Sequence, residues 1–207
     1  NGLKSTWRLI QTPPAPGAWN MAVDETLLVG MNIQRALPVL RLYAWNPPCL
    51  SLGYAQPYQD VNQPALQKLG WDVVRRPTGG RAILHTDELT YAVIGPHDEP
   101  HLAGGVLESY QRLSRALRQA LLDLGITVQS LAQPEAQIIQ AGKGPVCFEV
   151  PSNYEITWQG KKLVGSAQAR RKEGVLQHGS LPLFGDLRRI TQALNFPAQE
   201  DRTRASE

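Results

Sequence analysis

The chain has 207 residues, of which 42% are apolar and 19% are charged, and its net charge is +3. This composition can bury a full core, so it excludes an intrinsically disordered chain, and no run of basic residues resembles a nucleic-acid-binding arm. No apolar run reaches the roughly 18 residues that a membrane span needs, and the chain opens without an apolar secretory core. We therefore expect a cytoplasmic protein without nucleic-acid or membrane partners, whose two cysteines, Cys49 and Cys147, are reduced.

The first half of the chain is predicted to alternate short strands with two helices. Asn20 is a candidate N-cap for a helix beginning at Met21, because apolar residues follow it at helical spacing. Asn46-Pro47-Pro48 separates two strand-like segments. Strands are expected at 7–10, 39–43, 50–54, 72–76, 81–84 and 89–94, and a short helix at 65–69.

The second half contains the clearest helix and a further series of strands. Apolar residues recur at intervals of three and four from Val106 to Leu124, and Gly125 follows as a stop signal. A polar stretch at 133–144 predicts a loop, and the final residues 198–207 either fray or lead into a longer natural chain. Strands are expected at 147–150, 154–158, 162–168 and 175–183, with a hairpin turn at 159–161 and a last helix at 187–194. The pattern predicts one α+β domain over 1–207 with a mixed, mainly antiparallel sheet.

Arg75-Arg76-Pro77-Thr78-Gly79-Gly80-Arg81 is the first segment that suggests chemistry. Two glycines let a backbone approach a ligand closely, and their N–H groups can surround an anion. Three arginines around such a turn would match a phosphate or a carboxylate. The segment alone slightly favours a plain hairpin turn with solvated arginines, and its spacing is not that of a Walker P-loop.

Cys147 lies where the polar loop meets a predicted strand. A thiol at a loop edge can be exposed enough to attack a thioester or a carbonyl, whereas a cysteine within a strand is more often a small core residue. Cys49, in an apolar stretch, favours the core role. Cys147 is therefore the candidate nucleophile of the two.

Lys162 precedes a strand that contains only small residues at Gly165-Ser166-Ala167, which leaves room for a ligand beside the backbone. The lysine could hold an anion, or transfer a proton if burial lowered its pKa. His85 and His178 could act as acid or base, although isolated histidines are more often structural. Histidines and cysteines never cluster in the sequence, so no metal site is expected.

Taken together, four segments in order resemble the biotin/lipoate protein ligase superfamily. They are Asn20-Met21-Ala22-Val23-Asp24-Glu25, Ser51-Leu52-Gly53-Tyr54-Ala55-Gln56, the Arg75 to Arg81 segment with His85, and Lys162-Leu163-Val164-Gly165-Ser166-Ala167-Gln168. The resemblance implies a catalytic domain that moves an octanoyl or lipoyl group onto a lysine of a lipoyl domain. It implies substrate binding by Arg76, Thr78, Gly79, Gly80, Arg81, His85, Gly165, Ser166 and Ala167. Strand alternation suggests that Leu52, Tyr54, Leu84 and Val164 line the acyl chain.

Two branches of that superfamily remain open. Lipoate-protein ligases use ATP and Mg to form an acyl-adenylate, which Lys162 and the Gly79-Gly80 turn would hold. Octanoyltransferases take the acyl group from acyl carrier protein through a cysteine thioester and need no cofactor. Cys147 followed by Phe148 resembles the nucleophile site of the Gram-positive-type octanoyltransferases, and Arg81 stands where typical ligases carry a third glycine.

The resemblance therefore favours the octanoyltransferase, with Cys147 and Lys162 as catalytic residues. The implied donor is octanoyl-acyl carrier protein. The implied acceptors are lipoyl domains, such as glycine cleavage H protein or the acyltransferase subunits of 2-oxoacid dehydrogenases. The lipoate-protein ligase remains the alternative.

Overall fold

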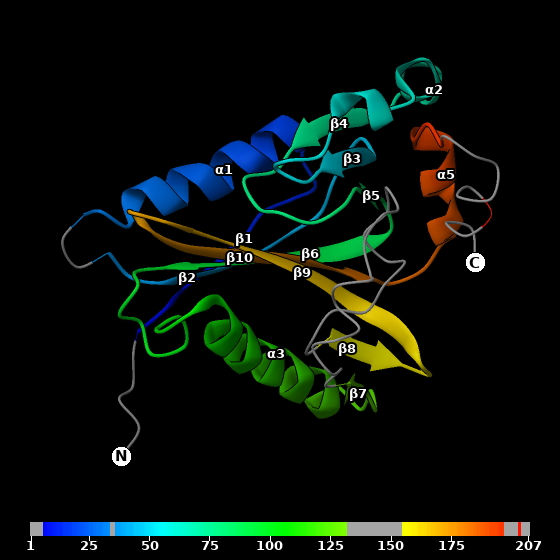
Figure 1. The fold of residues 1–207 in the computed structure, drawn as a ribbon. Helices are drawn as coiled ribbons and strands as arrows, with labels where there is room; N and C mark the ends of the chain where they lie inside the picture. The colour runs from blue at the N-terminus through cyan, green and yellow to red at the C-terminus, as the bar shows by residue number, and fades with distance from the viewer. Residues whose placement is uncertain (1–5, 34–35, 132–154, 197–202, 204–207) are drawn as a thin grey trace.

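The computed structural model describes residues 6–33, 36–131, 155–196 and 203 (Figure 1). The larger of its two sheets has the strand order β1 (Arg8–Gln11), β2 (Val39–Tyr43), β6 (Glu88–Gly95), β10 (Gly174–Pro182), β9 (Lys161–Arg171), β8 (Glu155–Trp158) and β7 (Gln129–Leu131). The smaller sheet has the order β4 (Asp72–Arg75), β3 (Cys49–Leu52) and β5 (Ile83–His85). β1 pairs with β2 and β3 with β4 in parallel, and the other pairs are antiparallel. This arrangement confirms the predicted α+β fold with a mixed, mainly antiparallel sheet.

Helices cover both faces of the larger sheet. α1 (Gly17–Gly30) and α3 (Val106–Asp123) lie on opposite faces, and the smaller sheet lies on the α1 side (Figure 1). α2 (Gln63–Leu69) and α5 (Ile190–Ala193), preceded by the 3-10 turns η1 (Tyr58–Asp60) and η2 (Leu187–Arg189), pack against the smaller sheet. Within the described residues, buried apolar side chains gather between α1 and the larger sheet, around the smaller sheet, and under α3.

The start of α1 differs from the prediction. The helix begins at Gly17 rather than Met21, so Asn20 lies inside it, and the predicted N-cap was wrong. The buried Asn20 side chain instead donates hydrogen bonds to two backbone carbonyls and accepts one from Arg41. The first turn packs closely on the smaller sheet because residue 17 has no side chain: a Cβ there would lie 2.4 Å from the Cys49 Sγ atom.

α3 confirms the predicted amphipathic helix almost to the residue. It begins at Val106, where the Glu108 carboxylate accepts a hydrogen bond from the Gly105 N–H at 2.6 Å. Leu113 and Leu121 are buried against the larger sheet. Gly125, which follows the helix, adopts a left-handed φ of 81°, a conformation that glycine favours.

The other elements confirm the sequence pattern in outline. The predicted strands and the α2 helix occur within about three residues of their expected bounds wherever the structure describes them. β7 was not predicted, and the last helix is shorter than 187–194 because its first turn is 3-10. The predicted loop at 133–144 and the predicted strand at 147–150 lie outside the described residues.

β9 contains an irregularity that bears on the site. Ile156 of β8 pairs with Val164, but Thr157 pairs with Lys162, so Leu163 is an extra residue in β9. Such a bulge interrupts the alternation of side chains along a strand. Ile156 and Val164 are both buried on the α3 side of the sheet, and Leu163 packs against the same cluster. Lys162 is therefore turned, with Thr157, to the opposite face.

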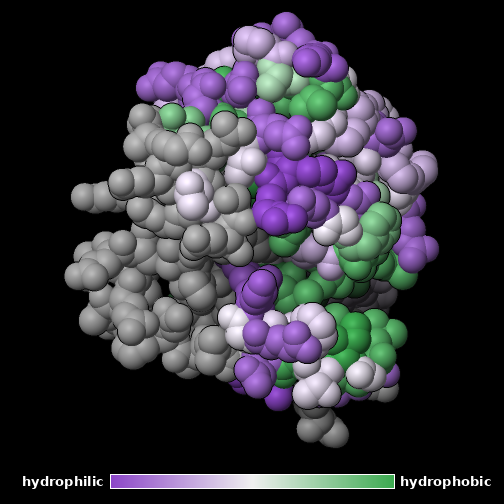
Figure 2. All heavy atoms as spheres, turned by 90° about the vertical axis from the view of Figure 1, so that its right-hand side faces the viewer, coloured by the Kyte–Doolittle hydropathy of each residue, from purple (hydrophilic) through white to green (hydrophobic). Residues whose placement is uncertain are grey.

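The surface carries separate apolar and polar areas. Figure 2 shows, on the coloured part of one face, apolar patches beside a strongly hydrophilic cluster. Among the described residues, no helix combines the length and the apolar character that a membrane span requires.

Candidate active site

A cavity opens between the two sheets, beside the N-terminal part of α1, which contributes Met21 to its wall. Its empty space is about 360 Å³, including the part open to solvent, and carbon atoms make up most of its wall. β3, β5 and the connection that follows β4 form one side, and β2, β6, β9 and β10 form the other. Of the residues predicted to bind substrate, the wall contains Arg76, His85, Gly165, Ser166 and Ala167.

The connection between β4 and β5, residues 76–82, is called the glycine loop here. Arg76 is buried beneath it and donates hydrogen bonds to the carbonyl oxygens of Gly79 at 2.9 Å and Arg81 at 2.6 Å. The same guanidinium donates to the carbonyl and hydroxyl oxygens of Ser51 at 2.9 and 3.0 Å. Arg76 therefore fastens the loop to β3. This role differs from both interpretations of the sequence, in which the arginine was either solvated or bound to an anion.

Arg75 is used in a similar way on the outer side of the loop. Its Nη1 atom lies within 3.0 Å of the carbonyl oxygens of Gly53, Tyr54 and Gln56. The backbone between β3 and η1 is thereby tied to β4. Arg75 and Arg76, two of the three arginines suggested as anion ligands, thus donate hydrogen bonds to the protein's own backbone.

The glycine loop lies directly on the end of β3. The Thr78 carbonyl accepts a hydrogen bond from the Tyr54 N–H at 2.9 Å. An ideal Cβ on Gly53 would lie 1.9 Å from the Gly80 carbonyl oxygen, so only glycine fits at position 53 with the loop in this place. Gly80 itself has a left-handed φ of 89°. Gly53 belongs to a motif that carried the family resemblance, but this contact could not be predicted from the motif.

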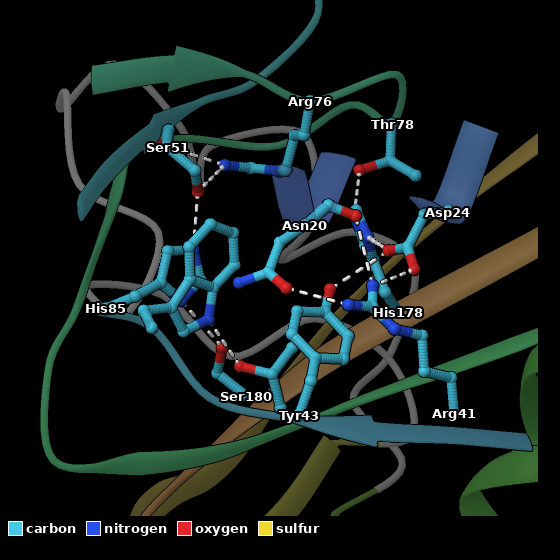
Figure 3. A network of polar contacts seen from close by, with 12 residues as sticks. Asn20, Asp24, Arg41, Tyr43, Ser51, Arg76, Thr78, His85, His178 and Ser180 are labelled. Carbon is cyan, nitrogen blue, oxygen red and sulfur yellow. Dashed lines mark hydrogen bonds and ion pairs between the residues drawn. The ribbon is translucent and has the colours of Figure 1, made fainter. Parts of the chain in front are cut away.

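Thr78 ends a buried chain of hydrogen bonds that starts on α1 (Figure 3). Its hydroxyl lies 2.6 Å from His178 Nε2, and His178 Nδ1 lies 3.4 Å from an oxygen of Asp24. Asp24 also accepts from Arg41 at 2.7 Å and from the Tyr43 hydroxyl at 2.9 Å. Burial lowers the pKa of His178, although the Asp24 carboxylate opposes this, so the imidazole is neutral at neutral pH.

A second chain of the same kind runs through His85 (Figure 3). Its Nε2 atom lies 2.7 Å from the Ser51 hydroxyl, and its Nδ1 atom lies 2.6 Å from Glu88. Thr90 and Ser180 also donate to Glu88. Burial by itself would raise the pKa of Glu88, but His85 and the three hydrogen bonds outweigh burial and lower it.

The His85 ring is also fixed by packing. It stacks on the Trp45 ring with centroids 4.0 Å apart and an angle of 10° between the planes. The Trp45 indole N–H in turn donates to the Thr90 hydroxyl at 2.7 Å. Trp45, Thr90, Ser180, Asp24 and Glu88 were not predicted as site residues. Asp24 stands in a motif quoted for the resemblance, and nothing in the sequence singled out the other four.

The two predicted catalytic residues differ in what the structure says of them. The β9 bulge places Lys162 on the same face of the sheet as Gly165, which lines the cavity, so the lysine is near the cavity without being part of its wall. Cys147 lies outside the described residues. Cys49 is fully buried, and burial together with the carboxylates of Asp72 and Glu88 raises its thiol pKa far above the usual range, which confirms its core role.

The residues expected to line the acyl chain are not part of the wall of this cavity. Leu52 and Leu84 are buried in the cluster around the smaller sheet, and Val164 is buried under α3. Tyr54 is 64% exposed. β3 and β5 are covered on both faces, so their apolar pattern does not indicate which side faces the cavity.

The described residues contain no group of three or more histidine, cysteine, aspartate and glutamate side chains that could hold a metal ion. The polar atoms of the cavity wall are bonded mainly to one another, as the two chains through His85 and His178 illustrate. The wall of the site therefore favours an apolar ligand, beside the glycine loop and the strand that contains Lys162.

Comparisons with known proteins agree with this geometry. Residues 16–207 match the family described as "Lipoyl protein ligase A/B catalytic domain". The chain is 45% identical over 204 residues to "Octanoyltransferase LipM" of Carboxydothermus hydrogenoformans, covering 97% of this chain and 74% of that protein. It is 38% identical over 205 residues to the protein of the same name in Bacillus subtilis, with the same two coverages.

Solved structures with the same fold are lipoate-protein ligases. A bi-partite lipoate protein ligase from Thermoplasma acidophilum superposes with a TM-score of 0.72 at 22% identity, over 98% of this chain and 71% of that one. A lipoate-protein ligase A bound with ATP gives a TM-score of 0.70 at 23% identity, over 98% and 75%. The family match over most of the chain and the identity to its relatives confirm the predicted resemblance: the chain belongs to the lipoyl protein ligase A/B catalytic domain family.

Proposed function

We propose that this acyltransferase moves an octanoyl group from octanoyl-acyl carrier protein to a lysine of a lipoyl domain, through a thioester on Cys147. The relatives named octanoyltransferase support the reaction class. The single structural observation that carries the proposal is the carbon-walled cavity between the sheets, with the glycine loop at one side and Lys162 on the face of β9 that borders it. The apolar character of its wall supports a hydrocarbon chain as the group bound there.

The apolar tail would provide much of the binding. Burying roughly seven hydrocarbon groups at about 0.8 kcal/mol each gives on the order of 5 kcal/mol before ordering costs. Because the polar atoms in the wall are paired within the protein, the tail displaces few hydrogen bonds to water as it enters.

In the first step, the Cys147 thiolate attacks the carbonyl carbon of the carrier thioester. The new C–S bond forms, the C–S bond to the carrier breaks, and the carrier leaves as a thiolate that takes up a proton. A Lys162 ammonium near Cys147 would favour its thiolate form. Backbone N–H groups at the Gly79-Gly80 turn would bind the oxyanion.

In the second step, the neutral amine of the acceptor lysine attacks the Cys147 thioester. The C–N bond forms, the C–S bond to Cys147 breaks, and the amine loses one proton as the thiolate returns. A thioester is converted to an amide, so the reaction is downhill and uses neither ATP nor a metal.

The ligase alternative would require a place for the adenylate phosphates. Phosphates in proteins are commonly held by arginine side chains and free backbone N–H groups. Here the Arg75 and Arg76 guanidinium groups donate to backbone carbonyls on both sides of the glycine loop. This arrangement supports the transferase over the ligase.

The test is the mass of the intact protein after mixing with octanoyl-carrier protein in the absence of ATP. We expect a gain of one octanoyl group that Cys147→Ala abolishes and that an apo lipoyl domain discharges. Cys49→Ala is the matched control and should still gain the group. No gain without ATP, together with ATP-dependent modification of the lipoyl domain by free octanoate or lipoate, would establish the ligase instead.

A further inference from the structure

Two chains of the same chemical make-up meet at the glycine loop from different sides of the cavity. Each consists of a carboxylate, an imidazole and a hydroxyl group: Asp24–His178–Thr78 and Glu88–His85–Ser51. We propose that His178 and His85 are positioning residues that hold the glycine loop in its catalytic place, and that neither is an acid or base toward substrate. This inference deepens the proposed function and rests on it for the activity part of its test.

The first chain connects the larger sheet to the loop directly. Asp24 is on α1, His178 is on β10, and Thr78 is in the glycine loop. All three side chains are buried, with Asp24 and Thr78 completely inaccessible. Thr78 is therefore fixed to an element that lies 100 residues further along the chain.

The second chain reaches the loop through one more residue. Glu88 on β6 of the larger sheet bonds to His85 on β5, and His85 bonds to Ser51 on β3. The Ser51 hydroxyl then accepts from Arg76, whose other Nη atom holds the Gly79 and Arg81 carbonyls. Both chains thus connect the larger sheet to the loop, the second through the smaller sheet, so together they set its position relative to the cavity.

The direction of the hydrogen bonds explains why the imidazoles position rather than transfer protons. An ionised carboxylate can only accept, so Nδ1 of each ring must donate to Asp24 or Glu88. Nε2 of each ring is engaged by the hydroxyl of Thr78 or Ser51. Both nitrogens of both rings are occupied within the protein, so neither ring presents a nitrogen to a ligand in the cavity.

The glycine loop needs these two chains because its central residues form few contacts of their own. Gly79 and Gly80 are exposed and have no side chains with which to anchor themselves. Their N–H groups would bind the oxyanion only if the backbone is held to within a fraction of an ångström. Thr78 and Arg76, on the near side of the two glycines, are the residues through which the rest of the protein holds the loop.

The test compares substitutions that differ only in the hydrogen bond. Thr78→Val keeps the shape and removes the hydroxyl, whereas Thr78→Ser keeps the hydroxyl. Thr191→Val, the same exchange in α5, is the control away from the cavity. We expect Thr78→Val to lower kcat of octanoyl transfer about tenfold with KM for octanoyl-carrier protein nearly unchanged, and Thr78→Ser to recover most of the loss.

His178 is tested by two partial mimics. His178→Gln can still offer an acceptor to Thr78, whereas His178→Asn is too short to reach it, so we expect the Gln variant to retain more activity. If both variants abolish transfer while Thr78→Val keeps the wild-type kcat, His178 acts on substrate and the proposal is overturned. Wild-type kcat in Thr78→Val overturns it in any case.

A second measurement does not depend on the transferase assay. Hydrogen exchange at the Tyr54 amide, which donates to the Thr78 carbonyl of the loop, should accelerate in Thr78→Val and in Ser51→Ala, while exchange in α3 stays as in the unmodified protein. If exchange at this amide is unchanged in both, the chains do not position the loop. Failure of octanoyl transfer in the unmodified protein, with the exchange result as expected, would instead refute the proposed function alone.

Discussion

Replacing Gly53 by alanine should displace the glycine loop. Gly53 does not adopt a left-handed φ, so the substitution strains nothing in its own backbone and its whole effect is steric. The new Cβ would lie 1.9 Å from the Gly80 carbonyl oxygen, and a normal contact requires that oxygen to retreat by about 1.5 Å. The bonds from Arg76 to Gly79 and Arg81, now 2.9 and 2.6 Å, cannot both survive such a shift.

The cost follows from these contacts. Overpacking in a tight site typically lowers the free energy of unfolding by about 1–3 kcal/mol, and the lost hydrogen bonds act in the same direction. A misplacement of about 1 Å near the reacting atoms can cost on the order of 100-fold in rate. We therefore expect Gly53→Ala to lose about 2 kcal/mol of stability and about 100-fold in the rate of acyl-enzyme formation.

Urea unfolding and the single-turnover rate with octanoyl-carrier protein measure the two effects. Gly30→Ala, at the end of α1, is the matched control because nothing lies within 4 Å of its Cβ position. That variant should keep the transfer rate and be as stable as the unmodified protein or slightly more so. If Gly53→Ala unfolds at the same urea concentration and reacts at the normal rate, the glycine loop is not confined by β3 and the reasoning fails.

Three further predictions concern buried groups. Asp24→Asn leaves Arg41 buried without its carboxylate partner and should lower the unfolding free energy by about 3–5 kcal/mol in urea, whereas Asp186→Asn, at an exposed pair, should change it far less. The pKa of Glu88 is lowered by folding, so its ionised form stabilises the fold above the unfolded-state pKa of about 4.3. In urea titrations, the unmodified protein should therefore have a higher free energy of unfolding than Glu88→Gln at neutral pH, and this difference should disappear as pH falls through the folded pKa. A difference that does not depend on pH would contradict the assignment. Cys49 should resist alkylation by iodoacetamide in the folded protein, as mass spectrometry of peptides would show, and rapid modification there would contradict its burial.

The sequence predicted the elements that depend on local periodicity. α3 could be placed almost to the residue because its apolar face repeats over five turns, and the β8–β9 hairpin follows from the predicted turn at 159–161 between two extended runs. Asn20 was assigned as a cap because its residue type favours that position. The actual helix start depends on the close packing of Gly17 against Cys49, which is a tertiary contact and leaves no local signal.

The candidate site was predictable only in part, for a related reason. Motifs identified Arg76, His85 and the small residues of β9, all of which line the cavity. The partners of the two histidines could not be derived in the same way. Asp24 and His178 are separated by 154 residues, and Glu88, although three residues from His85, meets it only through the turn between β5 and β6.

The extra residue in β9 changes how the Lys-x-x-Gly spacing should be understood. In a regular strand, residues three apart point to opposite faces, so Lys162 and Gly165 could not serve the same ligand. Because Leu163 is an extra residue in the bulge, Lys162 and Gly165 face the same side of the sheet, as residues two apart do in a regular strand. A regular strand that kept Leu163 would therefore turn the lysine toward α3, whereas deleting Leu163 would leave it on the cavity face. A redesign of this fold that made β9 a regular strand would keep every residue of the motif. Lys162, the motif's only positively charged residue, would nevertheless face away from the cavity.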